Sequence, residues 1–139
     1  YFFASAFAYF AFLMIKKQMF EILIFVFIGV TFFQLLLNVR NTFGVVWSIT
    51  AILILVGIVI YQAQLNYAVS VMISSIVLFD SFLTSAWIMF LSLTKPKQAG
   101  DAYNLQKTTS IPAFFWGLLF FSQAVFFFYL VLKLVLNNF

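Results

Sequence analysis

Long apolar runs separated by short polar breaks dominate the chain. They cover residues 19–37, 43–61, 68–93 and 112–137. Each is close to the roughly 20 residues that an α-helix needs to cross about 30 Å of hydrocarbon. The outward and inward alternation of a spanning β-strand is missing from stretches such as residues 52–56. The pattern therefore predicts an all-α, polytopic membrane helix bundle with four transmembrane helices.

A further apolar segment, residues 1–15, precedes the first run. As a helix it would be about 22 Å long, which is too short to cross the bilayer. Three interpretations stay open: part of a fifth span, an interfacial helix packed on the bundle, or one bent helix that continues through Lys16 and Lys17. A signal peptide is not expected, because no charged region precedes the apolar residues. We treat residues 1–139 as a single membrane domain, with residues 94–110 as a polar loop.

Composition indicates lipid as the medium around most of this chain. Of its residues, 66% are hydrophobic and 7% are charged, whereas a soluble domain is nearer half apolar and a quarter charged. The basic residues stand singly or in pairs at the ends of apolar runs, as is typical of membrane flanks, and they form no basic stripe for nucleic acid. The expected partners are the lipid bilayer and other membrane protein subunits, with no nucleic acid.

Residues that could carry chemistry are few. The chain has no cysteine and no histidine, and its acidic side chains are limited to Glu21, Asp80 and Asp101. The usual zinc, haem and iron–sulfur ligand sets cannot be assembled from these residues. No phosphate loop, dinucleotide turn or nucleophile elbow occurs. We therefore predict no catalytic, cofactor-binding or metal-binding residues, no cofactor apart from bound lipids, and no enzymatic activity beyond that of a complex in which the chain is an accessory subunit.

Asp80 is the most informative residue, because it falls at the middle of the third run. A carboxylate at that depth costs about 2.5–3.5 kcal/mol on insertion. At about 100° per residue, the small polar residues of this run fall within an arc of about 140°, which should turn away from lipid. They are Ser70, Ser74, Asp80, Ser81, Thr84, Ser85 and Ser92.

Two polar clusters are predicted from these positions. Gln123 lies near the middle of the fourth run, so we expect a helix-packing cluster of Asp80, Ser81, Thr84 and Gln123 with a hydrogen bond between Gln123 and Asp80. A proton- or cation-exchanging carboxyl and a charge pair with a partner subunit are the alternatives for Asp80. Near the membrane surface, Lys17, Glu21 and Lys133 are expected to form an interfacial ion pair.

The second half of the chain, residues 68–137, resembles MARVEL-type tetraspan membrane proteins of the synaptogyrin kind. The resemblance lies in Phe79-Asp80-Ser81-Phe82-Leu83, in Thr94-Lys95-Pro96-Lys97, and in a last run that reads Ala113-Phe114-Phe115 and then Ser122-Gln123-Ala124-Val125. It implies a non-enzymatic role in membrane organisation or vesicle apposition. Residues 1–15 depart from it, because those proteins have a soluble tail there.

The leading functional hypothesis from the sequence is a non-catalytic integral membrane subunit that packs within a larger, organellar or respiratory complex. It depends on the small size of the chain, its one polar helix face and its 22 phenylalanines. A MARVEL-like membrane organiser is the alternative, and a transporter or proton-path component that uses Asp80 is the second alternative. In each case the protein is a multi-pass integral membrane protein, with an organellar inner membrane among the candidate locations.

Overall fold

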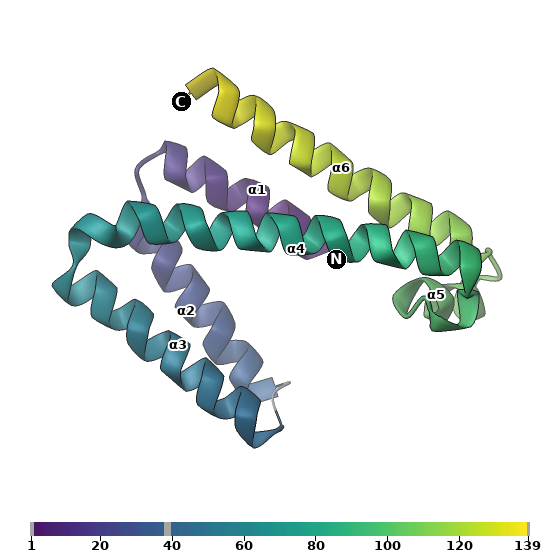
Figure 1. Cartoon of the computed structure of the whole chain (residues 1–139), viewed down its shortest axis with the longest axis horizontal. Coiled ribbons are helices and arrows are strands. Elements are labelled where there is room, and N and C mark those ends of the chain that lie inside the picture. The colour runs from purple at the N-terminus through teal and green to yellow at the C-terminus, as the bar shows by residue number, and fades with distance from the viewer. Residues whose placement is uncertain (1, 38–39, 139) are drawn as a thin grey trace. The chain divides into compact units, whose positions relative to one another are not determined.

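The computed structural model describes residues 2–37 and 40–138, and these residues form helices and turns with no strand (Figure 1). The helices are α1 (Phe2–Lys16), α2 (Phe20–Leu37), α3 (Thr42–Tyr61), α4 (Asn66–Thr94), α5 (Asp101–Thr109) and α6 (Ala113–Asn138), with short 3-10 turns η1 (Ala63–Leu65) and η2 (Pro96–Gln98). The predicted all-α membrane bundle with an apolar N-terminal helix is confirmed.

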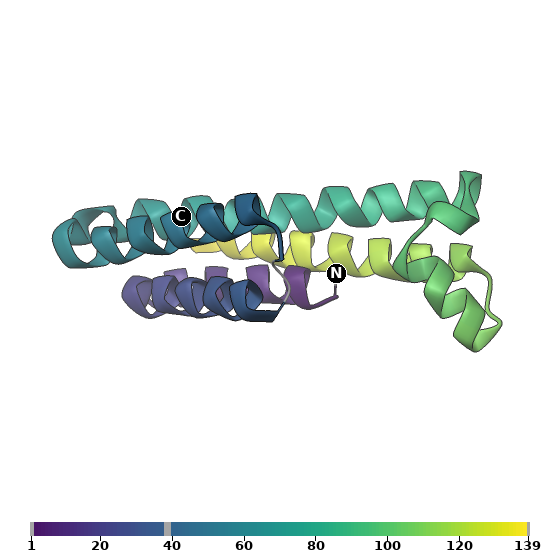
Figure 2. The same ribbon diagram turned by 90° about the horizontal axis from the view of Figure 1, so that it is seen from below.

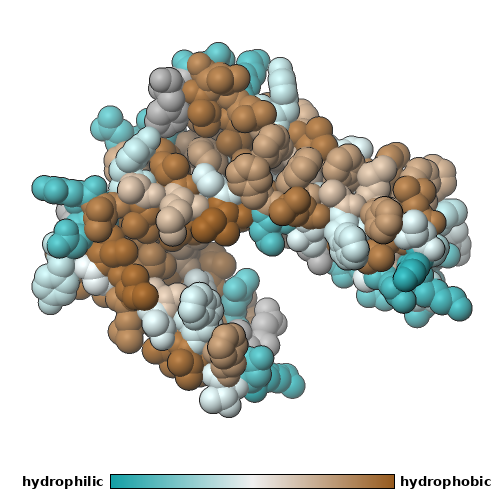
Figure 3. All heavy atoms as spheres, in the orientation of Figure 1, coloured by the Kyte–Doolittle hydropathy of each residue, from teal (hydrophilic) through white to brown (hydrophobic). Residues whose placement is uncertain are grey.

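Four of the described helices, α2, α3, α4 and α6, are long and apolar enough to cross a membrane. They begin and end within two residues of the runs that the sequence marks as spans. Many of their large apolar side chains are exposed, and Figure 3 shows apolar surface along the helices with hydrophilic groups near their ends. Exposing such an apolar surface to water would cost much free energy, whereas exposing it to hydrocarbon does not. The chain is an integral membrane protein.

Helix α1 ends in a Schellman motif, which separates it from α2. Gln18 has a positive φ of 57°. Its N–H donates to Ile15 O at 2.9 Å, and the N–H of Met19 donates to Met14 O at 3.0 Å. These two bonds satisfy carbonyls at the end of α1 and turn the chain out of the helix. The interpretation of α1 and α2 as one bent helix through Lys17 is therefore wrong.

Packing divides the described chain into two compact units. Residues 14–73 form the first, which we call the α2–α3 unit, and residues 2–13 and 74–138 form the second, the α5–α6 unit. In the α2–α3 unit, α2 packs against α3. Asn41 begins α3 as its N-cap, with Oδ1 accepting from Gly44 N–H at 2.9 Å. The start of α4 also contacts α2, since the rings of Tyr67 and Phe20 meet edge to face at 5.4 Å.

In the α5–α6 unit, residues 74–94 of α4 lie beside α6 in both ribbon views (Figures 1 and 2). Aromatic contacts join them: the ring of Phe82 is 5.8 Å from that of Phe121 and 5.2 Å from that of Phe128. Helix α1 contributes Tyr9, whose ring is 6.0 Å from that of Phe127. Rings at these distances attract one another beyond the area that they bury.

Helix α5 lies within residues 94–110, which the sequence analysis treats as a polar loop. It begins after Gly100, whose φ of 54° and ψ of −115° suit glycine. The buried residues Ala99 and Ala102 pack with Ile88 and Ala113, so a small apolar cluster attaches α5 to the ends of α4 and α6. This cluster fixes the polar side chains of η2 and α5 beside the ends of two spans.

Helices α4 and α6 approach each other closely at Gly117, and this contact leads to a testable prediction. A Cβ at Gly117 would overlap Ser92 Oγ and lie 3.2 Å from Met89 Cα. We expect Gly117→Leu to lower the free energy of unfolding by about 2 kcal/mol, because overpacking displaces the helices. Gly29→Leu is the matched control, since a Cβ there meets nothing within 4 Å. Thermal unfolding in detergent, followed by circular dichroism, measures both. Equal stability of the two variants would contradict close packing at Gly117.

Candidate functional site

The small polar residues of α4 do not all face the same way: within residues 74–94, four serines are buried, whereas Ser75 and Thr84 are half-buried and Asp80 is exposed. The spacing of these four serines, of seven, four and seven residues, places them on one helix face, which we call the serine face: Ser74, Ser81, Ser85 and Ser92. Ser85 and Ser92 donate their hydroxyls to the carbonyls of Phe82 and Met89, at 2.8 and 2.7 Å. Small side chains that bond their own backbone allow a neighbouring helix to approach closely. The serine face is a packing surface.

Asp80 lies outside the serine face and is exposed. It is rotated by about 100° from the adjacent Ser81, which is buried. Its exposed neighbours on α4 are the apolar Phe79 and Leu83, and no described residue forms a hydrogen bond or ion pair with the carboxyl. Thr84 is half-buried, between these two environments. In a membrane this arrangement presents a carboxyl group to the surroundings of the helix.

Gln123 is half-buried on α6 and contacts α1. Its Nε2 donates to Ser5 Oγ at 3.2 Å, and the structure shows no bond between Gln123 and Asp80. The physical reason is that the side of α6 that carries Gln123 packs against α1, where Ser5, Ala8 and Ala11 are buried. Ser5 was not among the residues predicted from the sequence. The small residues Ser5, Ala8 and Ala11 recur at intervals of three residues along α1. This spacing was the signal in the sequence that could have identified a packing face.

The residues expected to form an interfacial ion pair belong to different elements of the fold. Lys17 lies in the turn after α1 and Glu21 in the first turn of α2, so they do not share one helix register. No described salt bridge joins them. Glu21 and Asn66 line a hollow of about 310 Å³ in the α2–α3 unit. Lys133 belongs to the α5–α6 unit, where it is exposed on α6.

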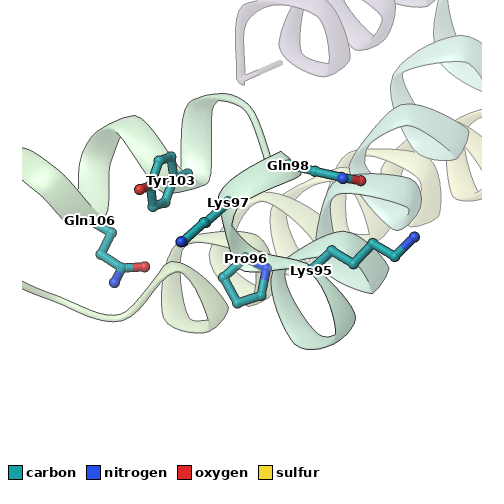
Figure 4. A pocket seen from close by; sticks show the side chains of 6 residues that line it. All are labelled: Lys95, Pro96, Lys97, Gln98, Tyr103 and Gln106. Atoms are coloured by element: carbon teal, nitrogen blue, oxygen red, sulfur yellow. The ribbon is translucent and has the colours of Figure 1, made fainter.

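A larger hollow, of about 540 Å³, lies at η2 and α5, and the sequence analysis did not predict it (Figure 4). We call it the η2–α5 pocket; its lining residues are Lys95, Pro96, Lys97, Gln98, Tyr103 and Gln106. Lys107 Nζ lies 4.5 Å from the centre of the Tyr103 ring, as a cation–π contact. The signal in the sequence was the pair Lys95 and Lys97 around a proline, followed by Tyr103 and Lys107 one helical turn apart.

The three acidic residues belong to three different helices. Glu21 is on α2, Asp80 on α4 and Asp101 at the start of α5. Among the described residues, no group of three side chains of the types His, Cys, Asp and Glu could hold a metal ion.

Comparison with protein families gives one finding. A family model described as Peptidase M50B-like matches residues 1–131 of the chain. Comparison with curated proteins and with solved structures finds no match.

This match overturns three expectations from the sequence. The resemblance to MARVEL-type tetraspan proteins is wrong, because the family found is a peptidase family of the site-2 protease kind. For the same reason, a non-catalytic subunit, a membrane organiser and a transporter that uses Asp80 are contradicted. The expectation of no enzymatic function is contradicted as well, since the family points to a membrane protease.

Proposed function

We propose that this chain, which belongs to the Peptidase M50B-like family, acts as part of a membrane-embedded peptidase on polypeptides that are themselves held in the bilayer. The family match over residues 1–131 is the observation that supports this function. The setting of the matched residues supports the substrate class. Four helices are suited to cross a membrane, so most of the matched residues lie in hydrocarbon, where another membrane-spanning segment can reach them.

The residues of this chain do not fit a catalytic zinc ion. Metallopeptidases commonly hold zinc through two histidines four residues apart on a helix, with a glutamate between them as general base. The sequence has no histidine and no cysteine, and no three ligand-type side chains meet in the described chain. We therefore propose that the residues of this chain contact the substrate, and we assign no hydrolytic step to any of them.

Asp80 is the candidate contact for such a substrate. A carboxyl inside a membrane is costly unless it has a partner, and basic or hydrogen-bond-donating side chains are the usual partners. The exposed side chains of Phe79 and Leu83 beside Asp80 offer an apolar surface to the rest of a passing helix. We expect the preferred substrate to be a membrane-spanning segment with a lysine, arginine or polar donor near the middle of the bilayer.

Reconstitution of the full-length protein in liposomes tests this function. Two transmembrane reporter peptides, identical except for a central lysine or leucine, carry a photoreactive group, and mass spectrometry measures their cross-linking and cleavage. We expect the lysine peptide to be cross-linked about ten times more strongly and to be cleaved, because the charge pair is worth on the order of 1.4 kcal/mol in the bilayer.

Asp80→Leu should remove the preference for the lysine peptide. Gln34→Leu is the matched control, because Gln34 is also exposed and polar on a spanning helix, α2. Equal cross-linking of both peptides by the natural protein, without fragments of either, would rule out the proposed function. Fragments of both peptides at equal rates would retain the peptidase and remove Asp80 from substrate recognition.

A further inference from the structure

We propose that the η2–α5 pocket binds the phosphate group of an anionic phospholipid. Several of the residues that line the pocket carry hydrogen-bond donors. Among the lining residues, Lys97 carries an ammonium group, Tyr103 a hydroxyl and Gln106 a side-chain amide, and none carries a carboxylate. Phosphate oxygens accept hydrogen bonds and carry negative charge, so donors and cations are the groups that bind them.

The directions of these side chains indicate which of the lining residues can contact the same ligand. Figure 4 shows Lys97, Tyr103 and Gln106 on one side of η2, with Lys95 and Gln98 pointing toward the other side. The Oε1 atom of Gln106 already accepts from Ala113 N–H at 3.0 Å. This bond fixes the side-chain amide, so its NH₂ group is left to donate to a ligand. Lys97, Tyr103 and Gln106 lie on the same side of η2, and we infer that they are the side chains that contact the phosphate group.

No acidic side chain of the described residues pairs with the lysines that line the pocket, so these lysines are left to bind an anion. No described residue forms an ion pair with Lys95 or Lys97, and both are exposed. Lys107 lies over the Tyr103 ring and adds a third positive charge close to the pocket. Asp101 begins α5 but is not among the lining residues. The net charge beside the pocket therefore favours an anion.

The place of the pocket in the fold favours a lipid over a free anion. It follows the end of α4 at Thr94 and precedes the start of α6 at Ala113, so it lies where two spans leave the hydrocarbon. Basic pockets at this level bind the headgroups of anionic lipids. On the apolar side, Leu93 and Phe115 are exposed close to these helix ends and can contact acyl chains. The volume of about 540 Å³ is in the usual range for a small-molecule site.

Lipid binding to the full chain in detergent, measured by native mass spectrometry, tests the proposal. Phosphatidylglycerol is titrated against phosphatidylcholine, and inorganic phosphate and soluble glycerophosphate are added as competitors. We expect phosphatidylglycerol to bind at least five times more tightly than phosphatidylcholine, and neither soluble anion to displace it at millimolar concentration. Equal affinity for the two lipids, or displacement by inorganic phosphate, would overturn a lipid site.

Three variants distinguish lipid binding at this pocket from a general attraction of anionic lipid to positive charge. Lys97→Gln should weaken phosphatidylglycerol binding about five-fold, whereas Lys133→Gln, which removes an exposed charge from α6, should leave it unchanged. Tyr103→Phe should weaken binding while net charge stays constant. Circular dichroism establishes that each variant keeps its helices. The proposal fails if Lys97→Gln and Lys133→Gln weaken binding equally, or if Tyr103→Phe has no effect.

Discussion

Leucine in place of Ser85 is expected to lower the free energy of unfolding by about 3 kcal/mol, near the upper end for an overpacked interior. Ser85 is completely buried on the serine face of α4. It lies seven residues before Ser92, which meets Gly117 of α6. The same face of α4 is therefore in close contact with its neighbour, and a leucine side chain has no space there.

Ser122→Leu is the matched control for Ser85→Leu. Ser122 is exposed on α6, and its hydroxyl donates to Leu118 O at 2.7 Å within the same helix. Leucine at that position should be tolerated in the bilayer, since it removes a polar group from a surface that faces apolar surroundings. Unfolding in sodium dodecyl sulfate, followed by circular dichroism, measures the two variants. A similar stability of both would mean that the serine face is not a close packing surface.

The spans could be predicted from the sequence because their physical cause is local. A run such as residues 43–61 has enough apolar side chains to cross hydrocarbon whatever it packs against. The packing partners of each polar residue could not be predicted in the same way. An arc of about 140° holds both Asp80 and Ser85, and only the position of the neighbouring helices decides which of the two is buried.

Neither the η2–α5 pocket nor the family could be predicted from the local sequence pattern, and the reasons differ. The pocket depends on a helix of nine residues inside a polar stretch, held by the small buried residues Ala99 and Ala102, which a hydropathy pattern does not mark. The family match is distributed over residues 1–131 and corresponds to no short motif with metal ligands. Because the sequence has no such motif, a peptidase could not be predicted from catalytic residues.

Asp80→Leu is expected to stabilise the isolated protein, which is the opposite of what an anchoring role would give. The carboxyl is exposed on a spanning helix and has no partner among the described residues. Removing it should recover about 2.5–3.5 kcal/mol of insertion free energy, because Asp80 lies at the middle of the spanning helix α4. The measurements are the inserted fraction of α4 in microsomal membranes and thermal unfolding of the purified chain in detergent.

Asp80→Asn separates charge from polarity in the same experiment, and Asp101→Leu is the control because Asp101 lies outside the spans. We expect Asp80→Asn to give a smaller gain than Asp80→Leu, and Asp101→Leu to give none. A loss of stability with Asp80→Asn would show that the carboxyl fastens helices together, as the sequence pattern predicts. A gain, together with loss of preference for a lysine-bearing substrate, would mean that the chain keeps an unfavourable carboxyl in the membrane because a substrate provides its partner.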